Sequence, residues 1–165
     1  MEEIKISATE DRNTTYKELL PQLESLIARE DDFIANLANI SAALKQALPY
    51  ASWVGFYLLK NGELVVGPFQ GKVACTRIKI GSGVCGTAAK RKKTIIVPNV
   101  YEFPGHIFCD SDSKSEIAIP ILKNEDVIGV LDLDSAEYNA FHDVDAENLQ
   151  RVANIVVSLA KVNRV

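Results

Sequence analysis

Apolar residues change their spacing along this chain, from helical intervals near both ends to strand-like runs in between. Asp31 and Asp32 precede the second helical stripe, where a helix N-terminus favours negative charge. Phe141-His142-Asp143 precedes the last stripe and offers an apolar entry residue and a capping side chain. Pro21 should break the first helical segment or open a second helix. The three stripes consist of Tyr16, Leu19, Leu20, Leu23, Leu26 and Ile27, then Phe33, Leu37, Ile40, Leu44 and Leu48, and finally Leu149, Val152, Ala153, Val156, Leu159 and Ala160.

The middle of the chain predicts an antiparallel sheet. Asn61-Gly62 separates two of its apolar runs and is a strong hairpin turn signal, and residues 123–126 predict a second hairpin. We therefore expect an α+β fold, with a central antiparallel sheet of about six strands and the N- and C-terminal helices packed on one side. The expected strands span residues 51–59, 64–69, 73–80, 94–97, 116–121 and 127–134.

Length, charge and hydropathy limit the number of domains, the partners and the location of the protein. A chain of 165 residues corresponds to one domain, so we expect a single domain over residues 1–165. The net charge of −4 gives no basic excess for a phosphate backbone, so a nucleic-acid partner is not expected. No apolar run approaches the ~20 residues that span a bilayer, and the first residues lack the pattern of a signal peptide. A cytoplasmic location without membrane attachment is expected.

Three cysteines, Cys75, Cys85 and Cys109, admit two interpretations. Their odd number does not suit a disulfide framework, and their spacing lacks the CxxC pattern of a zinc ribbon. In the first interpretation all three are buried structural thiols. In the second they are redox-active, because Cys109 lies in a loop at residues 98–114 where a thiol is mobile and accessible.

The other two cysteines have distinct settings. A glycine-rich turn at residues 81–90 leads into a short helix, and it places Cys85 near a helix N-terminus that favours the thiolate. Cys75 ends or interrupts a strand. A loop thiol that can meet another thiol is the arrangement of a redox catalyst.

Carboxylates at the end of one strand form the second candidate feature. Strand alternation places Ile128, Val130, Asp132 and Asp134 on one face, and Glu116 opens the presumed partner strand. If the strands pair, three carboxylates converge and raise one another's pKa. Such a cluster suits an ammonium group, a metal, or an oxygen that receives a proton. The alternative is an ordinary solvated strand end.

A metal role is not expected for these acids. His106 is the only histidine near the loop, His142 belongs to a helix entry, and no short ligand spacing is present. A third feature is the face shared by Trp53, Gly55 and Tyr57. It is either half of a hydrophobic core or the wall of a small-molecule pocket.

Seven strings spread over nearly the whole chain resemble the GAF-domain free methionine-(R)-sulfoxide reductases. The order of three thiols, a glutamate and an Asp-x-Asp pair is the specific part of this resemblance. General GAF sensors share the fold-level pattern without all three cysteines. The strings are residues 52–57 (SWVGFY), 75–78 (CTRI), 81–88 (GSGVCGTA), 97–100 (VPNV), 108–113 (FCDSDS), 115–117 (SEI) and 129–135 (GVLDLDS).

The resemblance implies a role for each cysteine. Cys109 would attack the sulfoxide sulfur and become a sulfenic acid. Cys75 would close a disulfide with Cys109, and Cys85 would be an auxiliary or relay thiol. The resemblance leaves the division of work between Cys75 and Cys85 open. It also implies no bound cofactor, recycling by thioredoxin fed by NADPH, and a homodimer, the commonest closed assembly.

The resemblance also implies a substrate site. Glu116, Asp132 and Asp134 would hold the ammonium group of free methionine-(R)-sulfoxide and protonate its oxygen, and Trp53 and Tyr57 would flank its methyl group. The same carboxylates oppose thiolate formation at Cys109. Two rival functions remain: a GAF sensor that binds a small ligand without turnover, and a thiol protein that senses peroxide.

Overall fold

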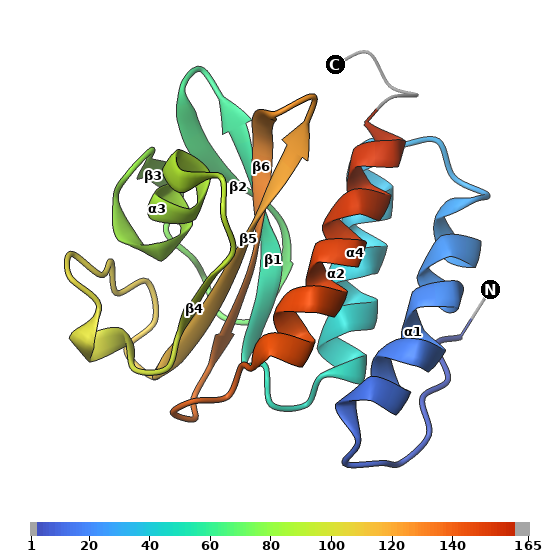
Figure 1. The fold of residues 1–165 in the computed structure, drawn as a ribbon. Helices are drawn as coiled ribbons and strands as arrows, with labels where there is room; N and C mark the ends of the chain where they lie inside the picture. Colours follow the sequence, from blue (N-terminus) through green and yellow to red (C-terminus); the bar gives the residue numbers. More distant parts are fainter. Residues whose placement is uncertain (1–2, 161–165) are drawn as a thin grey trace.

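The computed structural model describes residues 3–160, which fold as a six-stranded antiparallel sheet between two unequal helical layers (Figure 1). The strands lie in the order β3-β2-β1-β6-β5-β4. All adjacent pairs are antiparallel, so the predicted α+β sheet is confirmed. The strands are β1 (Trp53–Lys60), β2 (Glu63–Gln70), β3 (Arg77–Lys79), β4 (Ile95–Val97), β5 (Ser115–Lys123) and β6 (Asp126–Ser135).

The predicted terminal helices lie together on one face of the sheet. They are α1 (Arg12–Ile27), α2 (Phe33–Ala47) and α4 (Asp143–Leu159); α2 and α4 contact the strands, and α1 packs on both of them. Their apolar stripes and one face of the sheet form the larger core, which includes Leu37, Leu131 and Val152. None of the helices within residues 3–160 is long and apolar enough to cross a membrane.

The opposite face carries a fourth helix, α3 (Gly83–Arg91), and a loop with one short 3-10 turn, η1 (Val100–Glu102). A second, smaller core lies between this helix and the sheet. The sequence predicted this short helix but not its place, whereas the expectation that the N- and C-terminal helices pack on one side is confirmed. Because each face of a central sheet needs cover, α3 is the element that closes the second face.

Both predicted hairpin turns are confirmed. Asn61 and Gly62 join β1 to β2 with φ values of 52° and 82°, the paired positive angles of a type I′ turn. Asn124 and Glu125 join β5 to β6 with φ values of 50° and 68°. These two turns fix the register of the two hairpins that meet along the β1–β6 pair.

The helix ends follow the sequence signals with one exception. Asp32 caps α2 by accepting a hydrogen bond from the Ala35 amide at 2.7 Å, and His142 is the N-cap residue of α4. Pro21 lies inside α1 and does not break it, so that prediction is wrong. The neighbouring Leu19, Leu20 and Leu23 are buried, and this packing offsets the single backbone hydrogen bond that proline removes.

Two strand predictions also need correction. A β-bulge between β5 and β6 makes Ile128 the extra residue, because Ile121 pairs with Gly129 and Leu122 with Val127. Ile128 therefore packs into the larger core and does not share the face of Asp132. The strand expected at residues 73–80 is reduced to β3, because residues 73–75 turn away from the sheet toward the loop that carries Cys109.

A buried polar group joins the first helix to the last. Asp145 on α4 accepts hydrogen bonds from the Tyr16 hydroxyl at 2.9 Å and the Tyr50 hydroxyl at 2.6 Å, and it forms an ion pair with Arg12. It also accepts from the backbone amide of His142 at 2.8 Å. Asp145 is fully buried, so these donors replace the water that an ionised carboxylate otherwise requires.

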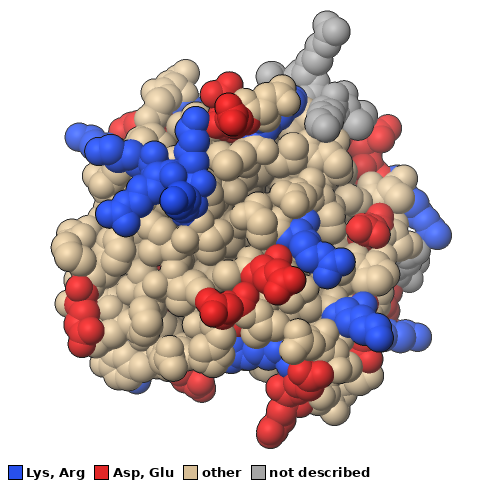
Figure 2. Space-filling model, in the orientation of Figure 1, with Lys and Arg blue, Asp and Glu red and all other residues tan. Residues whose placement is uncertain are grey.

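The charged surface is mixed in sign. Figure 2 shows acidic and basic side chains interspersed over the face drawn, with one basic group over the region of α3. Four consecutive basic residues, 90–93, lie at the C-terminal end of that helix, where positive charge complements the helix dipole.

Candidate active site

A small pocket lies between the second face of the sheet, α3 and the loop at residues 98–114. Its cavity volume is about 30 Å³, room for one or two water molecules. The pocket brings together most of the side chains that the sequence singled out; Cys75 joins them through a disulfide. The lining residues are Trp53, Tyr57, Val73, Ala74, Ile78, Gly83, Val84, Cys85, His106, Ile107, Cys109, Asp110, Ser113, Glu116, Asp132 and Asp134.

Strand register places the three carboxylates together. Glu116 on β5 is the direct partner of Asp134 on β6, and Asp132 lies two residues before Asp134 on the same face. Glu116 and Asp132 are buried, with 6% and 5% of their surface exposed. The interpretation as a solvated strand end is therefore wrong for these two residues.

The environment of the carboxylates raises their pKa values. Burial raises the pKa of Glu116 well above its ordinary range, and the charge of Asp134 adds to this. Burial and the charge of Glu116 do the same to the pKa of Asp132. For Asp134, burial raises the pKa to about 6, although a hydrogen bond from the Ser113 hydroxyl at 2.6 Å lowers it in part. All three carboxyls therefore keep their protons to a higher pH than exposed acids do.

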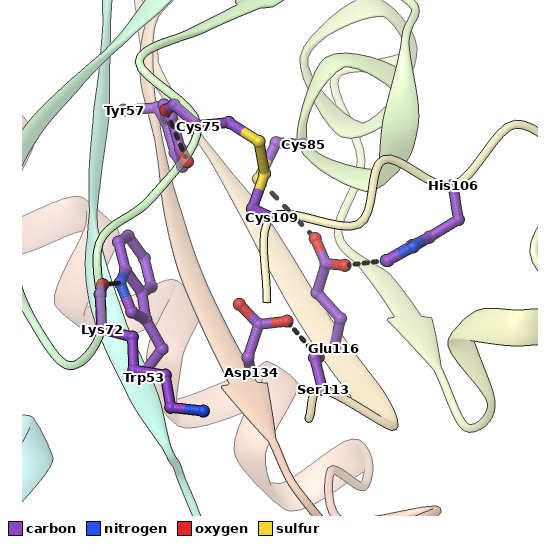
Figure 3. Close-up of a disulfide and its surroundings, with 10 residues drawn as sticks. All are labelled: Trp53, Tyr57, Lys72, Cys75, Cys85, His106, Cys109, Ser113, Glu116 and Asp134. Carbon is purple, nitrogen blue, oxygen red and sulfur yellow. Dashed lines mark hydrogen bonds and ion pairs between the residues drawn. A yellow bond between two sulfur atoms is a disulfide. The ribbon is translucent and has the colours of Figure 1, made fainter. Parts of the chain in front are cut away.

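Cys75 and Cys109 form a disulfide beside the pocket, between the segment before β3 and the long loop (Figure 3). Their Cα atoms lie 5.3 Å apart, although 34 positions separate them in sequence. Lys72 strengthens this closure through ion pairs with Asp110, at 3.3 Å, and with Asp112. Two chain segments are thus tied together over the carboxylates.

Cys85 is a buried free thiol beside the disulfide (Figure 3). Its Sγ donates to Glu116 Oε1 at 3.8 Å. Burial, followed by the charges of Asp132 and Glu116, raises the pKa of Cys85 well above its ordinary range. The expectation of a thiolate at this helix N-terminus is wrong, because burial among acids outweighs the helix dipole.

Trp53 and Tyr57 form the side wall of the pocket, and their polar atoms hold the segment that carries Cys75. The Trp53 indole donates to the Lys72 carbonyl at 3.0 Å, and the Tyr57 hydroxyl donates to the Cys75 carbonyl at 3.2 Å. Their rings stack with centroids 6.0 Å apart. Gly55 has no space for a side chain, since a Cβ there would lie 2.3 Å from the Cβ of Phe69.

Sequence reasoning missed the contacts of His106 and Ser113. His106 Nε2 lies 2.9 Å from Glu116 Oε2, and burial lowers the pKa of His106, which favours the neutral imidazole. The sequence signal that could have identified His106 is its position in the loop, three residues before Cys109. Ser113 gave no sequence signal beyond the composition of the same loop.

The pocket contains the groups that thiol-based reduction requires. A cysteine pair able to exchange electrons as dithiol and disulfide lies beside carboxyl groups that hold protons. A set of acids also suits a ligand with an ammonium group. Among the residues described, Cys85, Glu116 and Asp132 are the group whose donor atoms could hold a metal ion.

Comparison with known proteins agrees with this chemistry. The GAF domain family model matches residues 32–158. The chain is 46% identical over 147 residues to the free methionine-R-sulfoxide reductase of Escherichia coli, covering 89% of this chain and 87% of that protein. It is 40% identical over 161 residues to the Saccharomyces cerevisiae enzyme of the same name, covering 93% and 89%.

A solved structure extends the similarity to three dimensions. The free methionine-R-sulfoxide reductase from Neisseria meningitidis, solved in complex with its substrate, superimposes with a TM-score of 0.96 at 44% identity. The match covers 99% of this chain and 98% of that chain. The chain therefore belongs to the GAF-domain proteins and, among them, to the family of free methionine-R-sulfoxide reductases.

Proposed function

We propose that this protein is an oxidoreductase that converts free L-methionine-(R)-sulfoxide to methionine by cysteine chemistry. The observation that carries the proposal is the Cys75–Cys109 disulfide, which closes over a pocket of buried, proton-holding carboxyls. A disulfide at this place is the oxidised product that a thiol reductase would leave after one turnover. The family of the chain indicates the substrate, because two relatives are named free methionine-R-sulfoxide reductase.

The reaction has three steps. The Cys109 thiol attacks the protonated sulfoxide sulfur and forms an S–S bond; this bond and the substrate S–O bond then break as the oxygen bonds to the Cys109 sulfur, which gives methionine and a Cys109 sulfenic acid. The Cys75 thiol then attacks the sulfenic acid, forms the disulfide and releases water. A dithiol reductant finally reduces the disulfide to two thiols and is itself oxidised.

The carboxyls divide two tasks according to their environments. Asp134, with a pKa of about 6, is mainly ionised at neutral pH and binds the substrate ammonium group. Glu116, whose pKa lies well above its ordinary range, keeps a proton and donates it to the sulfoxide oxygen as the S–O bond weakens. Asp132 lies beside both groups and shares the ammonium site.

The remaining residues position the substrate and the thiols. Trp53 and Tyr57 flank the substrate methyl group with their apolar faces. Cys85 is an auxiliary thiol that is buried and in contact with Glu116. Peptide-bound methionine lacks the free ammonium group, so a small acidic pocket selects the free amino acid.

We also propose the setting in which the enzyme works. Thioredoxin fed by NADPH regenerates the thiols, no cofactor is bound, and the free thiol of Cys85 fits a reducing cytoplasm. The protein forms a single domain over residues 1–165 and assembles as a symmetric homodimer. Most of its helical apolar stripes pack on the sheet, so a second copy would use exposed apolar side chains such as Ile34. Sedimentation that finds only an 18 kDa species would exclude the dimer.

The decisive test supplies free methionine-(R)-sulfoxide and a dithiol reductant to the purified protein and measures methionine. We expect turnover of the R epimer and of neither the S epimer nor a peptide-bound sulfoxide. A protein that binds the sulfoxide without releasing methionine is a ligand sensor. One that forms its disulfide with hydrogen peroxide but not with the sulfoxide is a peroxide sensor.

A further inference from the structure

Three buried side chains in the pocket present donor atoms close enough to share one metal ion. The Cys85 sulfur and one carboxylate oxygen each of Glu116 and Asp132 all lie within 4.8 Å of one another. They come from α3, β5 and β6, so rigid elements hold them. Tetrahedral zinc, with bonds of about 2.3 Å to sulfur and 2.0 Å to oxygen, separates sulfur from oxygen by about 3.5 Å. The Cys85 Sγ–Glu116 Oε1 distance is 3.8 Å, which needs only a small adjustment.

Asp132 gives an independent indication that this place receives a ligand. Asp132 lines the pocket, and its buried Oδ1 atom has no hydrogen-bond partner among residues 3–160. A buried carboxylate oxygen without a donor carries a desolvation penalty of roughly 1–3 kcal/mol or more. A proton, an ammonium group or a metal cation removes that penalty.

His106 orients one of the three ligands. Its Nε2 atom contacts Glu116 Oε2 at 2.9 Å, which turns Glu116 Oε1 toward Cys85. Metal-binding carboxylates in proteins are commonly fixed by such an outer hydrogen bond. The donor set also has a chemical preference, because a cysteine sulfur favours zinc-like ions over magnesium and calcium, which prefer all-oxygen sites.

The size of the pocket fits an ion better than an amino acid in this state of the protein. The cavity of about 30 Å³ holds an ion with one water, whereas small-molecule pockets occupy roughly 300 Å³ or more. We propose that the pocket is also a binding site for a zinc-class divalent cation, held by Cys85, Glu116 and Asp132. The ion replaces the Cys85 thiol proton and any carboxyl protons, which pass to solvent, and no electrons are transferred.

This site gives the enzyme a means of inhibition, a consequence that rests on the proposed function. Glu116 and Asp132 are the same groups that we propose for the sulfoxide oxygen and the ammonium group. The cation and the substrate therefore exclude each other. Free zinc would hold the enzyme in a resting state until a chelator or competing thiols remove the ion.

Cobalt(II) titration of the disulfide form tests the site without any substrate. The chain has three cysteines, and two of them are joined, so a cobalt–thiolate absorption band in this form comes only from Cys85. We expect one equivalent of Co²⁺ to produce the band and Zn²⁺ to displace it. Cys85→Ser should lose the band, and Glu116→Gln and Asp132→Asn should each weaken binding at least tenfold.

Asp112→Asn is the matched control, because this acid lies in the same loop but is exposed. It should bind cobalt as the wild type does. Thermal melting of each variant verifies its fold. The site does not exist if the wild-type disulfide form shows no cobalt–thiolate band, or if either amide variant, folded, binds as tightly as the wild type.

A single-turnover experiment tests the exclusion of substrate. Reduced, desalted enzyme is mixed with free methionine-(R)-sulfoxide, and disulfide formation is followed by mass with and without Zn²⁺. We expect Zn²⁺ to slow the reaction at least tenfold, EDTA to restore it, and Asp132→Asn to lose most of this sensitivity. Cobalt binding without zinc inhibition would overturn the exclusion. Failure of the metal-free enzyme to react would instead contradict the proposed function, and the cobalt result would stand.

Discussion

His106 Nε2 and Glu116 Oε2 lie 2.9 Å apart, so the loop that carries Cys109 is joined to the carboxyl that we propose as proton donor. His106 is three residues from Cys109, and its side chain is nearly buried, with 5% exposed. Burial lowers the pKa of His106, so a neutral imidazole meets Glu116. One contact thus positions both the nucleophile and the proton source.

Replacing His106 should change both the rate and its pH dependence. A neutral imidazole that donates to the Glu116 carboxylate stabilises the ionised form and lowers its pKa. His106→Phe removes the donor, so the pKa of Glu116 rises and the alkaline fall of kcat moves to higher pH. We expect kcat at neutral pH to drop about tenfold, because Glu116 becomes a carboxylate as it gives up its proton and the variant lacks one hydrogen bond to that charged group. His106→Gln keeps a donor and should retain most of the wild-type profile.

The cysteines should separate into nucleophile and resolving thiol. Cys109→Ser should abolish turnover while leaving the melting temperature of the reduced protein near that of the wild type. Cys75→Ser should complete one turnover and accumulate a trappable Cys109 sulfenic acid, because the resolving thiol is missing. Mass spectrometry after dimedone trapping measures the amount of Cys109 sulfenic acid. If Cys85 resolves the sulfenic acid at the wild-type rate, the order of the two thiols is wrong.

The amide variants should show which carboxyl binds the substrate and which one transfers a proton. Asp134→Asn removes the charge that we propose for the ammonium group, so KM should rise by about tenfold to a hundredfold, or roughly 1.5–3 kcal/mol. Glu116→Gln should instead lower kcat by roughly 10²–10⁴. N-acetylmethionine sulfoxide, which lacks the ammonium group, should be a poor substrate for the wild type. Normal kinetics in all the amide variants would show that the carboxyls serve the fold alone.

Asp134→Asn should also stabilise the protein above pH 6. The pKa of Asp134 is about 6 in the folded state and 3.8 as its ordinary value. Between these two pH values the folded state therefore binds more protons than the unfolded chain. The contribution of Asp134 to the free energy of unfolding therefore falls as pH rises from about 4 to 6 and then levels off. Urea unfolding of the disulfide form should show a gain of the order of 1–3 kcal/mol for the variant at pH 7. Near pH 3.5 the gain should vanish.

The disulfide should control access to the pocket. The oxidised form has a cavity of only about 30 Å³, closed by Cys75–Cys109 and by the ion pairs of Lys72. We expect calorimetry to detect binding of free methionine, the product, to the reduced protein and at least tenfold weaker binding to the oxidised one. Equal affinities would mean that the pocket opens without reduction.

The features that could be predicted from the sequence are those that depend on neighbouring residues along the chain. Helical spacing identified the terminal helices, and Asn61-Gly62 identified a hairpin because few residues other than asparagine and glycine adopt two successive positive φ angles. Strand alternation placed Asp132 and Asp134 on one face, and the order of cysteines and acids indicated the family. These signals have a short range and are therefore visible in a single sequence.

Other features depend on contacts between distant residues and on the local dielectric, and they became visible only in the folded protein. Ile128 lies on the face opposite to the predicted one because a β-bulge shifts its register with β5. Pro21 lies inside a continuous helix because the packing of its buried neighbours offsets the lost hydrogen bond. Cys85 lies near a helix N-terminus, as expected, yet burial and the charges of Asp132 and Glu116 raise the pKa of its thiol well above the ordinary range. The free energy of an ionised group depends on everything that displaces water from it, and no local pattern of residues contains that information.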